Sequence, residues 1–116
     1  MLLGKKRMTY RANGLVPVAL DIDWQTLCPT KEEISAKITS RTKAIVFAYP
    51  YGKRYQIDHL AKYCKSFDLK IIEDASEAFS GVWYHGSPLA DLSMFSFGML
   101  KHFTAFGGSV SIVRTV

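Results

Sequence analysis

Short apolar runs of strand length alternate with amphipathic segments along most of this chain. The runs span residues 44–49, 69–72 and 92–97, and a further strand is predicted at residues 109–113, which alternate and are rich in β-formers. Unbroken apolar strands are typical of a sheet that is covered on both faces. Strands separated by helix-length segments predict βαβ units and a parallel arrangement. We therefore expect an α/β fold with three layers, in which helices cover a mostly parallel sheet.

Two of the intervening segments carry helix signals. Thr30 can cap the first, and Glu33 follows three residues later as in a capping box. The second segment, residues 58–67, has apolar side chains at helical spacing, which predicts an amphipathic helix. These helices are the expected cover of the sheet.

Polar groups at the predicted strand ends are the first candidates for a site, because ligands of such sheets bind at the carboxyl ends of the strands. Residues 15–22 are apolar and rich in valine, so we predict a further strand there, ending in Asp21 and Asp23. The other candidate segments are residues 49–52, 73–77 and 96–101.

The positive charge of the chain is concentrated at its N-terminal end. The net charge is +5, and four basic residues precede the first acidic one: Lys5, Lys6, Arg7 and Arg11. We interpret residues 1–13 as a basic N-terminal segment and residues 14–116 as one partial domain. An arm that binds nucleic acid is one interpretation of such a cluster. A solvated tail is favoured, since no basic surface interleaved with aromatic residues follows, and we expect no nucleic-acid partner.

Membrane, metal and disulfide roles find no support in the sequence. The apolar runs are too short to cross a bilayer, and no signal-peptide pattern opens the chain. Cys28 and Cys64 form no CxxC pair, and the three histidines share no ligand spacing with them. We expect free thiols, no metal site, no membrane partner and a cytoplasmic location.

Carboxylates directly follow one of the apolar runs. Glu73 and Asp74 end it, and Glu77 comes three residues after Asp74. One interpretation is an acid at the strand end that caps the next helix. The other is a carboxylate that holds a cationic nitrogen of a ligand, where opposite charge keeps both groups ionised. The local pattern leaves both open.

A serine and a lysine follow the next run. The hydroxyl of Ser96, at the strand end, can bind an anion. Lys101 has apolar neighbours in the sequence, and an amine that loses its solvation becomes more nucleophilic, as Schiff-base chemistry requires. A surface lysine whose stem covers an apolar patch is the alternative, and the pattern alone favours it.

Taken in order, these segments resemble the DegT/DnrJ/EryC1/StrS family, the aminotransferases of amino-sugar biosynthesis that depend on pyridoxal 5′-phosphate (PLP). The resemblance covers residues 14–114 and includes a stretch at residues 38–45 that is similar to the family's. Its motifs are Tyr51-Gly52 followed by Asp58, Glu73-Asp74-Ala75, Ser96-Phe97 with Lys101 four residues later, and Gly107-Gly108. It implies part of a large domain like that of aspartate aminotransferase.

The resemblance also implies roles for four residues. Asp74 pairs with the pyridine nitrogen of PLP, and Ser96 binds its phosphate. Lys101 forms the Schiff base and then moves protons as an acid and base. Glu77 lies near the ring oxygen of the cofactor, where the family usually has glutamine, and a second carboxylate there would repel a phenolate.

The implied reaction moves an amino group from an amino acid such as glutamate to a keto sugar linked to a nucleotide. Self-association is implied too, since family members are usually dimers. Family members are several times longer, with segments before Gly14 and after Val116 that build the phosphate grip and the small domain. The alternative is therefore an inactive fragment that keeps the fold as a binding or oligomerisation module.

Overall fold

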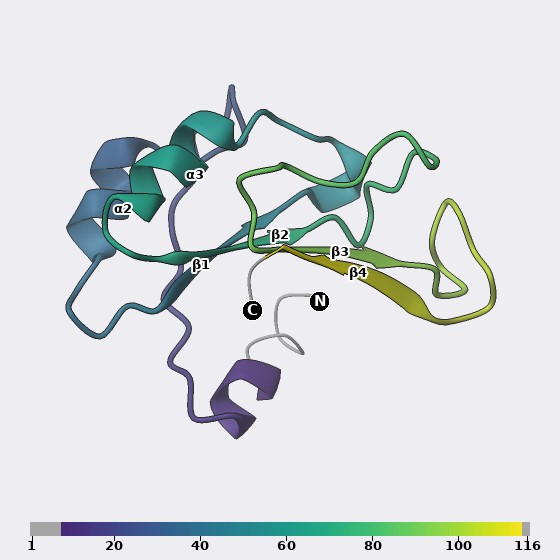
Figure 1. Ribbon diagram of the computed structural model, residues 1–116, viewed down its shortest axis with the longest axis horizontal. Coiled ribbons are helices and arrows are strands. Elements are labelled where there is room, and N and C mark those ends of the chain that lie inside the picture. Colours follow the sequence, from purple (N-terminus) through teal and green to yellow (C-terminus); the bar gives the residue numbers. More distant parts are fainter. Residues whose placement is uncertain (1–7, 115–116) are drawn as a thin grey trace.

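Four strands form a single sheet in the computed structural model, which describes residues 8–114 (Figure 1). The strands lie in the order β1-β2-β3-β4. β1, β2 and β3 are parallel, and β4 pairs with β3 in the antiparallel direction. The bounds are Ala44–Ala48 for β1, Lys70–Asp74 for β2, Leu92–Ser96 for β3 and Ser109–Val113 for β4. The prediction of an α/β fold with a mostly parallel sheet is confirmed.

The two predicted helices are present, with small differences at their ends. α2 spans Lys31–Lys37, and its cap is Thr30, whose Oγ1 accepts the backbone N–H of Glu33 at 3.1 Å. The Glu33 carboxylate accepts the backbone N–H of Asp21 at 3.0 Å. α3 spans Asp58–Lys65, two residues shorter than predicted. A 3₁₀ turn, η1, covers Pro50–Gly52 between β1 and α3.

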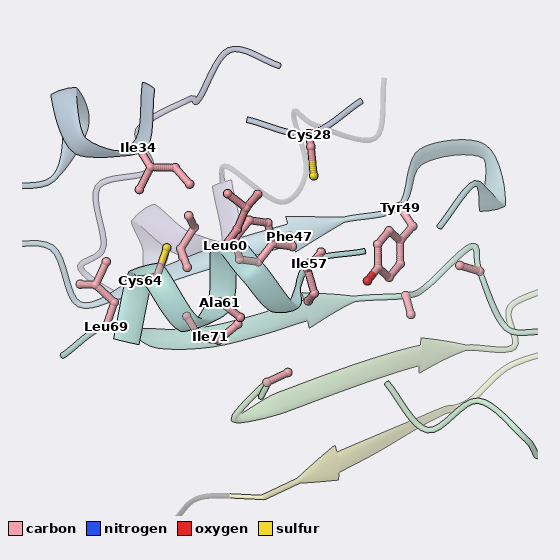
Figure 2. Packing of buried hydrophobic residues seen from close by; sticks show 14 of the residues in the cluster. Cys28, Ile34, Phe47, Tyr49, Ile57, Leu60, Ala61, Cys64, Leu69 and Ile71 are labelled. Atoms are coloured by element: carbon pink, nitrogen blue, oxygen red, sulfur yellow. The ribbon is translucent and has the colours of Figure 1, made fainter. Parts of the chain in front are cut away.

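The hydrophobic core lies between these two helices and one face of the sheet (Figures 1 and 2). Phe47 and Ile71 point into it from the sheet, and Leu60 and Cys64 point into it from α3. The alternate residues of β1 are exposed, including Val46 on the other face. Residues 8–12 are helical and lie on that other side in the view of Figure 1, where their side chains are mostly exposed. This second face is thus sparsely covered within the described residues.

The predicted strand over residues 15–22 is wrong. The segment joins no strand of the described sheet, and Val16 and Val18 are largely exposed. An apolar run becomes a strand only where a neighbour completes its hydrogen bonds, and Pro17 cannot donate one. The segment instead runs past α2, where Lys37 Nζ donates to the carbonyl of Ala19 at 3.3 Å.

Asp21 and Asp23 consequently do not lie at a strand end. The Asp23 carboxylate instead closes the turn that follows it. It accepts the backbone N–H groups of Gln25 and Thr26 at 3.0 and 2.9 Å, and the Thr26 hydroxyl at 3.1 Å. These donors, the backbone N–H of Thr26 first, lower the pKa of this exposed carboxyl. The proposed ligand role for this pair is not supported by their position.

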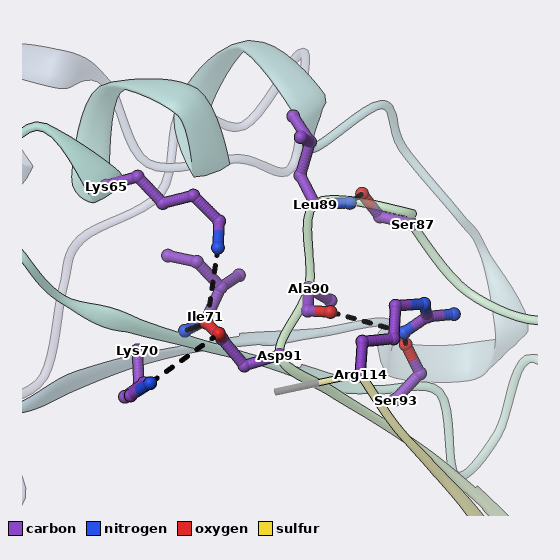
Figure 3. A network of polar contacts seen from close by, with 9 residues as sticks. All are labelled: Lys65, Lys70, Ile71, Ser87, Leu89, Ala90, Asp91, Ser93 and Arg114. Atoms are coloured by element: carbon purple, nitrogen blue, oxygen red, sulfur yellow. Dashed lines mark hydrogen bonds and ion pairs between the residues drawn. The ribbon is translucent and has the colours of Figure 1, made fainter. Parts of the chain in front are cut away.

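A polar cluster fixes the amino ends of β2 and β3 relative to one another (Figure 3). Asp91, which precedes β3, accepts the backbone N–H of Ile71 at 2.8 Å and lies 3.6 Å from Lys65 Nζ and 3.9 Å from Lys70 Nζ. Arg114 closes the other side by donating to the Ser93 hydroxyl at 2.9 Å. These contacts set the register between β2 and β3, and the register in turn sets the position of their carboxyl ends.

The basic N-terminal segment is described only from residue 8, so Lys5, Lys6 and Arg7 lie outside the described residues. Between residues 8 and 114, none of the helices has the length and apolar character needed to cross a bilayer. The cytoplasmic location and the absence of a nucleic-acid partner stay predictions.

Both cysteines should be protected from thiol reagents in the folded chain. They are free and buried, and burial raises the pKa of each thiol to about 11 from a usual 9.0. A rise of this size lowers the reactive thiolate fraction about 100-fold at neutral pH. Labelling with a chromogenic disulfide should therefore be slow in native buffer and complete within seconds in denaturant. Fast labelling of Cys64 in native buffer would contradict this packing.

Candidate functional site

The carboxyl ends of β2 and β3 bring Asp74 and Ser96 to one edge of the sheet. Asp74 pairs with Met94 across the parallel ladder, and Ser96 follows Met94 by two residues. Because side chains alternate along a strand, all three lie on the same face. That face is the one opposite α2 and α3. Asp74 is only 3% exposed, while Ser96 is partly exposed.

Asp74 also organises the turn that follows β2. Its Oδ1 accepts the backbone N–H of Ser76 at 3.2 Å and the Ser76 hydroxyl. The backbone N–H of Ala75 donates to the carbonyl of Met94 at 2.9 Å, which carries the pairing with β3 past the strand end. No helix follows β2 in the described residues, so the interpretation of an acid that caps the next helix is wrong, and the Asp74 carboxylate organises a turn instead.

Lys101 lies in the loop between β3 and β4. Phe97 closes the base of this loop: its N–H donates to Gly108 at 3.0 Å, and its carbonyl accepts from Ala105 and Gly107 at 3.0 and 3.1 Å. The sequence neighbours Met99 and Leu100 are 72% and 98% exposed. They do not surround the amine in the described structure, so the apolar environment expected from the sequence is not found.

The partner of Lys101 is instead a carboxylate. Lys101 Nζ lies 3.4 Å from Glu77 Oε1, and both side chains are mostly buried. The second oxygen of Glu77 accepts the backbone N–H of Tyr51 at 3.0 Å. The loops that follow β1, β2 and β3 thus meet at this pair. Two of the four predicted site residues are in contact here, and the other two share the adjacent sheet face.

Glu73 forms a second polar centre that the sequence did not predict. It lies on the core side of β2 and is fully buried. Four donors reach its carboxylate: the Ser93 hydroxyl at 2.6 Å, the Tyr49 hydroxyl at 2.6 Å, the backbone N–H of Ser87 at 2.8 Å, and the Tyr84 hydroxyl. A Cβ at Gly86 would collide with this carboxylate, so the 84–87 loop packs directly on it.

Opposing effects set the ionisation of Glu73. Burial acts to raise its pKa, but the donors from Ser93, Tyr49, Tyr84 and Ser87 outweigh burial and hold the pKa below its usual value. Burial, followed by the bond to this carboxylate, raises the pKa of Tyr84 to about 12. Glu73 is therefore a buried anion with neutral phenols as donors, directly beside Asp74 in the chain.

Comparison with known proteins gives one consistent family. The model of the DegT/DnrJ/EryC1/StrS aminotransferase family matches residues 8–114. The chain is 35% identical to a dTDP-4-dehydro-2,6-dideoxy-D-glucose 3-dehydratase of Saccharopolyspora spinosa, over 90% of this chain and 24% of that protein. It is also 35% identical to a 3-oxo-glucose-6-phosphate:glutamate aminotransferase of Bacillus subtilis, over 87% of this chain and 22% of that protein.

Solved structures show the same fold. The crystal structure of NtdA from Bacillus subtilis with the bound cofactor PMP superimposes with a TM-score of 0.74 and 33% identity, covering 89% of this chain and 23% of that one. The chain spans about a quarter of the length of the curated relatives it matches.

Proposed function

The chain belongs to the DegT/DnrJ/EryC1/StrS aminotransferase family, and from this membership we propose that it carries the PLP-binding edge of a sugar aminotransferase. The amino donor is an amino acid such as glutamate, and the acceptor is a keto sugar linked to a nucleotide. The dTDP-linked sugar of the first relative supports a nucleotide-linked acceptor. The glutamate of the second relative, which acts on a keto sugar phosphate, supports the amino donor. PMP, the amine form of PLP, is bound in the similar NtdA structure.

The observation that carries the proposal is the set of chemical groups gathered at one sheet edge. Asp74, Ser96 and Lys101 stand at or just after the ends of the adjacent parallel strands β2 and β3. A carboxylate suits the ring nitrogen of PLP, a hydroxyl suits its phosphate, and a primary amine suits its aldehyde. The groups on this edge therefore fit the cofactor.

Each residue has a separate task in this proposal. When bound, PLP supplies an electron sink that stabilises negative charge on the substrate carbon. Asp74 keeps the ring nitrogen protonated, because an adjacent anion favours the cationic form. Ser96 would hold the phosphate through its hydroxyl, and Glu77 would be the second carboxylate near the ring. Lys101 would hold the cofactor through its amine and would serve as the acid and base that moves a proton on the substrate.

Asp74→Asn should lower turnover strongly without unfolding the chain. Asparagine keeps the Oδ1 acceptor that Ser76 uses, but it removes the charge that faces the ring nitrogen. We expect kcat for amino transfer from glutamate to a nucleotide-linked keto sugar to fall on the order of 10²–10³-fold, as for loss of other preorganised charges. Asp68→Asn is the control, because Asp68 is exposed and precedes β2 at the opposite edge. Equal activity of both variants would contradict the role of Asp74.

A second candidate function is a binding or oligomerisation module without turnover. It is favoured by exposed apolar side chains in the loop around Lys101, among them Met99, Leu100, Phe103 and Phe106. The same surface supports self-association under either function. A folded wild-type chain that shows no amino transfer, yet self-associates in sedimentation experiments, would favour the module over the enzyme.

A further inference from the structure

Glu77 and His102 line a cavity of about 300 Å³, and Glu77 Oε1 lies 3.4 Å from Lys101 Nζ. The cavity is therefore next to the amine of the candidate site, and Arg54 lines it too. We propose that Arg54 supplies the cation of an oxyanion subsite, which takes a carboxylate or phosphate group of a substrate. This inference rests on the proposed function, because it places a substrate beside the amine that would bind PLP.

The guanidinium of Arg54 is available to a ligand. Within residues 8–114, no ion pair or side-chain hydrogen bond joins it to another residue. It lies instead over the ring of Tyr84, with 3.9 Å between Cζ and the ring centroid. A guanidinium stacked on an aromatic ring keeps the N–H donors at its edge free. Two such donors match the paired oxygens of a carboxylate or a phosphate.

The ring of Tyr84 is a fixed platform for this guanidinium. The Tyr84 hydroxyl donates to the carboxylate of Glu73, which is fully buried and accepts three further donors. The ring also meets that of Phe95 edge-on, with 6.1 Å between the centroids. The Glu73 network therefore holds the surface on which Arg54 lies.

The backbone on both sides of Arg54 is anchored as well. Before it, the N–H of Tyr51 donates to Glu77 Oε2 at 3.0 Å. Gly52 has a positive φ of 75°, and a Cβ there would lie 2.8 Å from the carbonyl oxygen of Glu77. After it, the hydroxyl of Tyr55 donates to the last carbonyl of β1 at 2.9 Å. Arg54 is itself exposed, but a side chain supported in this way loses less freedom when a ligand arrives.

The other groups around the cavity are compatible with an anion. Among the described residues that line it, Glu77 is the only carboxylate, and Lys101 balances its charge. Ser80 and His102 also line the cavity and can donate hydrogen bonds. The volume is at the lower end of ligand pockets. It therefore suits one end of a substrate, either a carboxylate of the amino donor or a phosphate of the nucleotide-linked sugar.

Protection of Arg54 from phenylglyoxal tests the proposal on the wild-type chain without PLP. This reagent modifies accessible guanidinium groups, and mass spectrometry of peptides gives the rate at each arginine. Arg41, an exposed arginine between α2 and β1, is the internal reference. At an anion concentration about ten times Kd, labelling of Arg54 relative to Arg41 should fall about tenfold, because only the free site reacts.

Two anions distinguish the sources of the bound group. Glutarate supplies carboxylates without an amine, and dTDP supplies phosphates without a sugar. Protection by glutarate alone assigns the subsite to the amino donor, and protection by dTDP alone assigns it to the nucleotide-linked acceptor. Protection by both assigns it to the two substrates in turn. If neither anion protects Arg54 more than Arg41, up to high millimolar concentrations, the proposal is overturned.

Arg54→Gln and Arg41→Gln separate the subsite from a general effect of charge, since each removes one exposed cation. In an NMR titration with the protecting anion, Kd should rise about tenfold in Arg54→Gln, the loss of one charge-assisted contact. Arg41→Gln should leave Kd unchanged. Arg54→Lys should recover part of the affinity, because lysine keeps the charge without the paired donors. An unchanged Kd in Arg54→Gln would show that Arg54 only supports Tyr84. No PLP is present, so attachment of the cofactor to Lys101 succeeds or fails independently.

Discussion

Glu73→Ala is expected to lower the free energy of unfolding by roughly 3–5 kcal/mol. The substitution removes an acceptor from four donors, those of Ser93, Tyr49, Tyr84 and Ser87, in a site without solvent. A buried donor left without a partner costs about 1–3 kcal/mol. Urea unfolding followed by circular dichroism measures the change. Glu73→Gln should lose less stability than Glu73→Ala, because the carbonyl oxygen of glutamine still accepts hydrogen bonds from some of these donors.

The pH dependence of stability gives an independent test of the same network. The pKa of Glu73 lies below its usual 4.5 in the folded chain. Ionised Glu73 therefore adds its full contribution to the free energy of unfolding above about pH 4.5. This stabilisation is lost as the pH falls below about 4.5 and through the folded pKa. The free energy of unfolding of Glu73→Gln should fall less steeply with decreasing pH than that of the wild-type chain. Glu32→Ala, at an exposed position, should change stability by less than about 1 kcal/mol; an equally small loss in Glu73→Ala would refute the network.

Lys101→Arg is expected to abolish amino transfer while keeping the fold. Arginine preserves a cation opposite Glu77, but its guanidinium does not act as a nucleophile at neutral pH. Turnover should fall by at least on the order of 10³-fold, with only a small change in the unfolding midpoint. Lys101→Ala should lose the same activity and the ion pair as well. Measurable turnover in Lys101→Arg would show that another amine does the chemistry.

Much of the fold follows from local sequence signals. The cap Thr30, the strand patterns and the α3 pattern depend on neighbours within a few residues. The structure has the four strands and α3 within two residues of their expected ends. The strand expected at residues 15–22 failed because its apolar pattern lacked a partner strand. Such a partner is a property of the tertiary fold and does not appear in local periodicity.

The sequence predicted where the candidate site residues lie on the sheet better than it predicted their contacts. Strand ends in a parallel sheet share one edge, so Asp74 and Ser96 were expected there from the strand pattern alone. The Glu77–Lys101 contact depends on how the 98–108 loop folds back, which no spacing rule gives. The Glu73 network was missed because its donors come from four separate segments. The alternation of side chains along β2 did indicate that Glu73 lies on the same face as the apolar Ile71.

In the proposed function, Lys101 is the amine to which PLP attaches. Incubation of the full chain with PLP, reduction with borohydride and peptide mapping tests it directly, because reduction makes the bond between a lysine amine and an aldehyde permanent. We predict the phosphopyridoxyl label on the peptide that contains Lys101, and its loss in Lys101→Arg. Label on other lysines only, or no label under saturating PLP in a folded chain, would contradict the account.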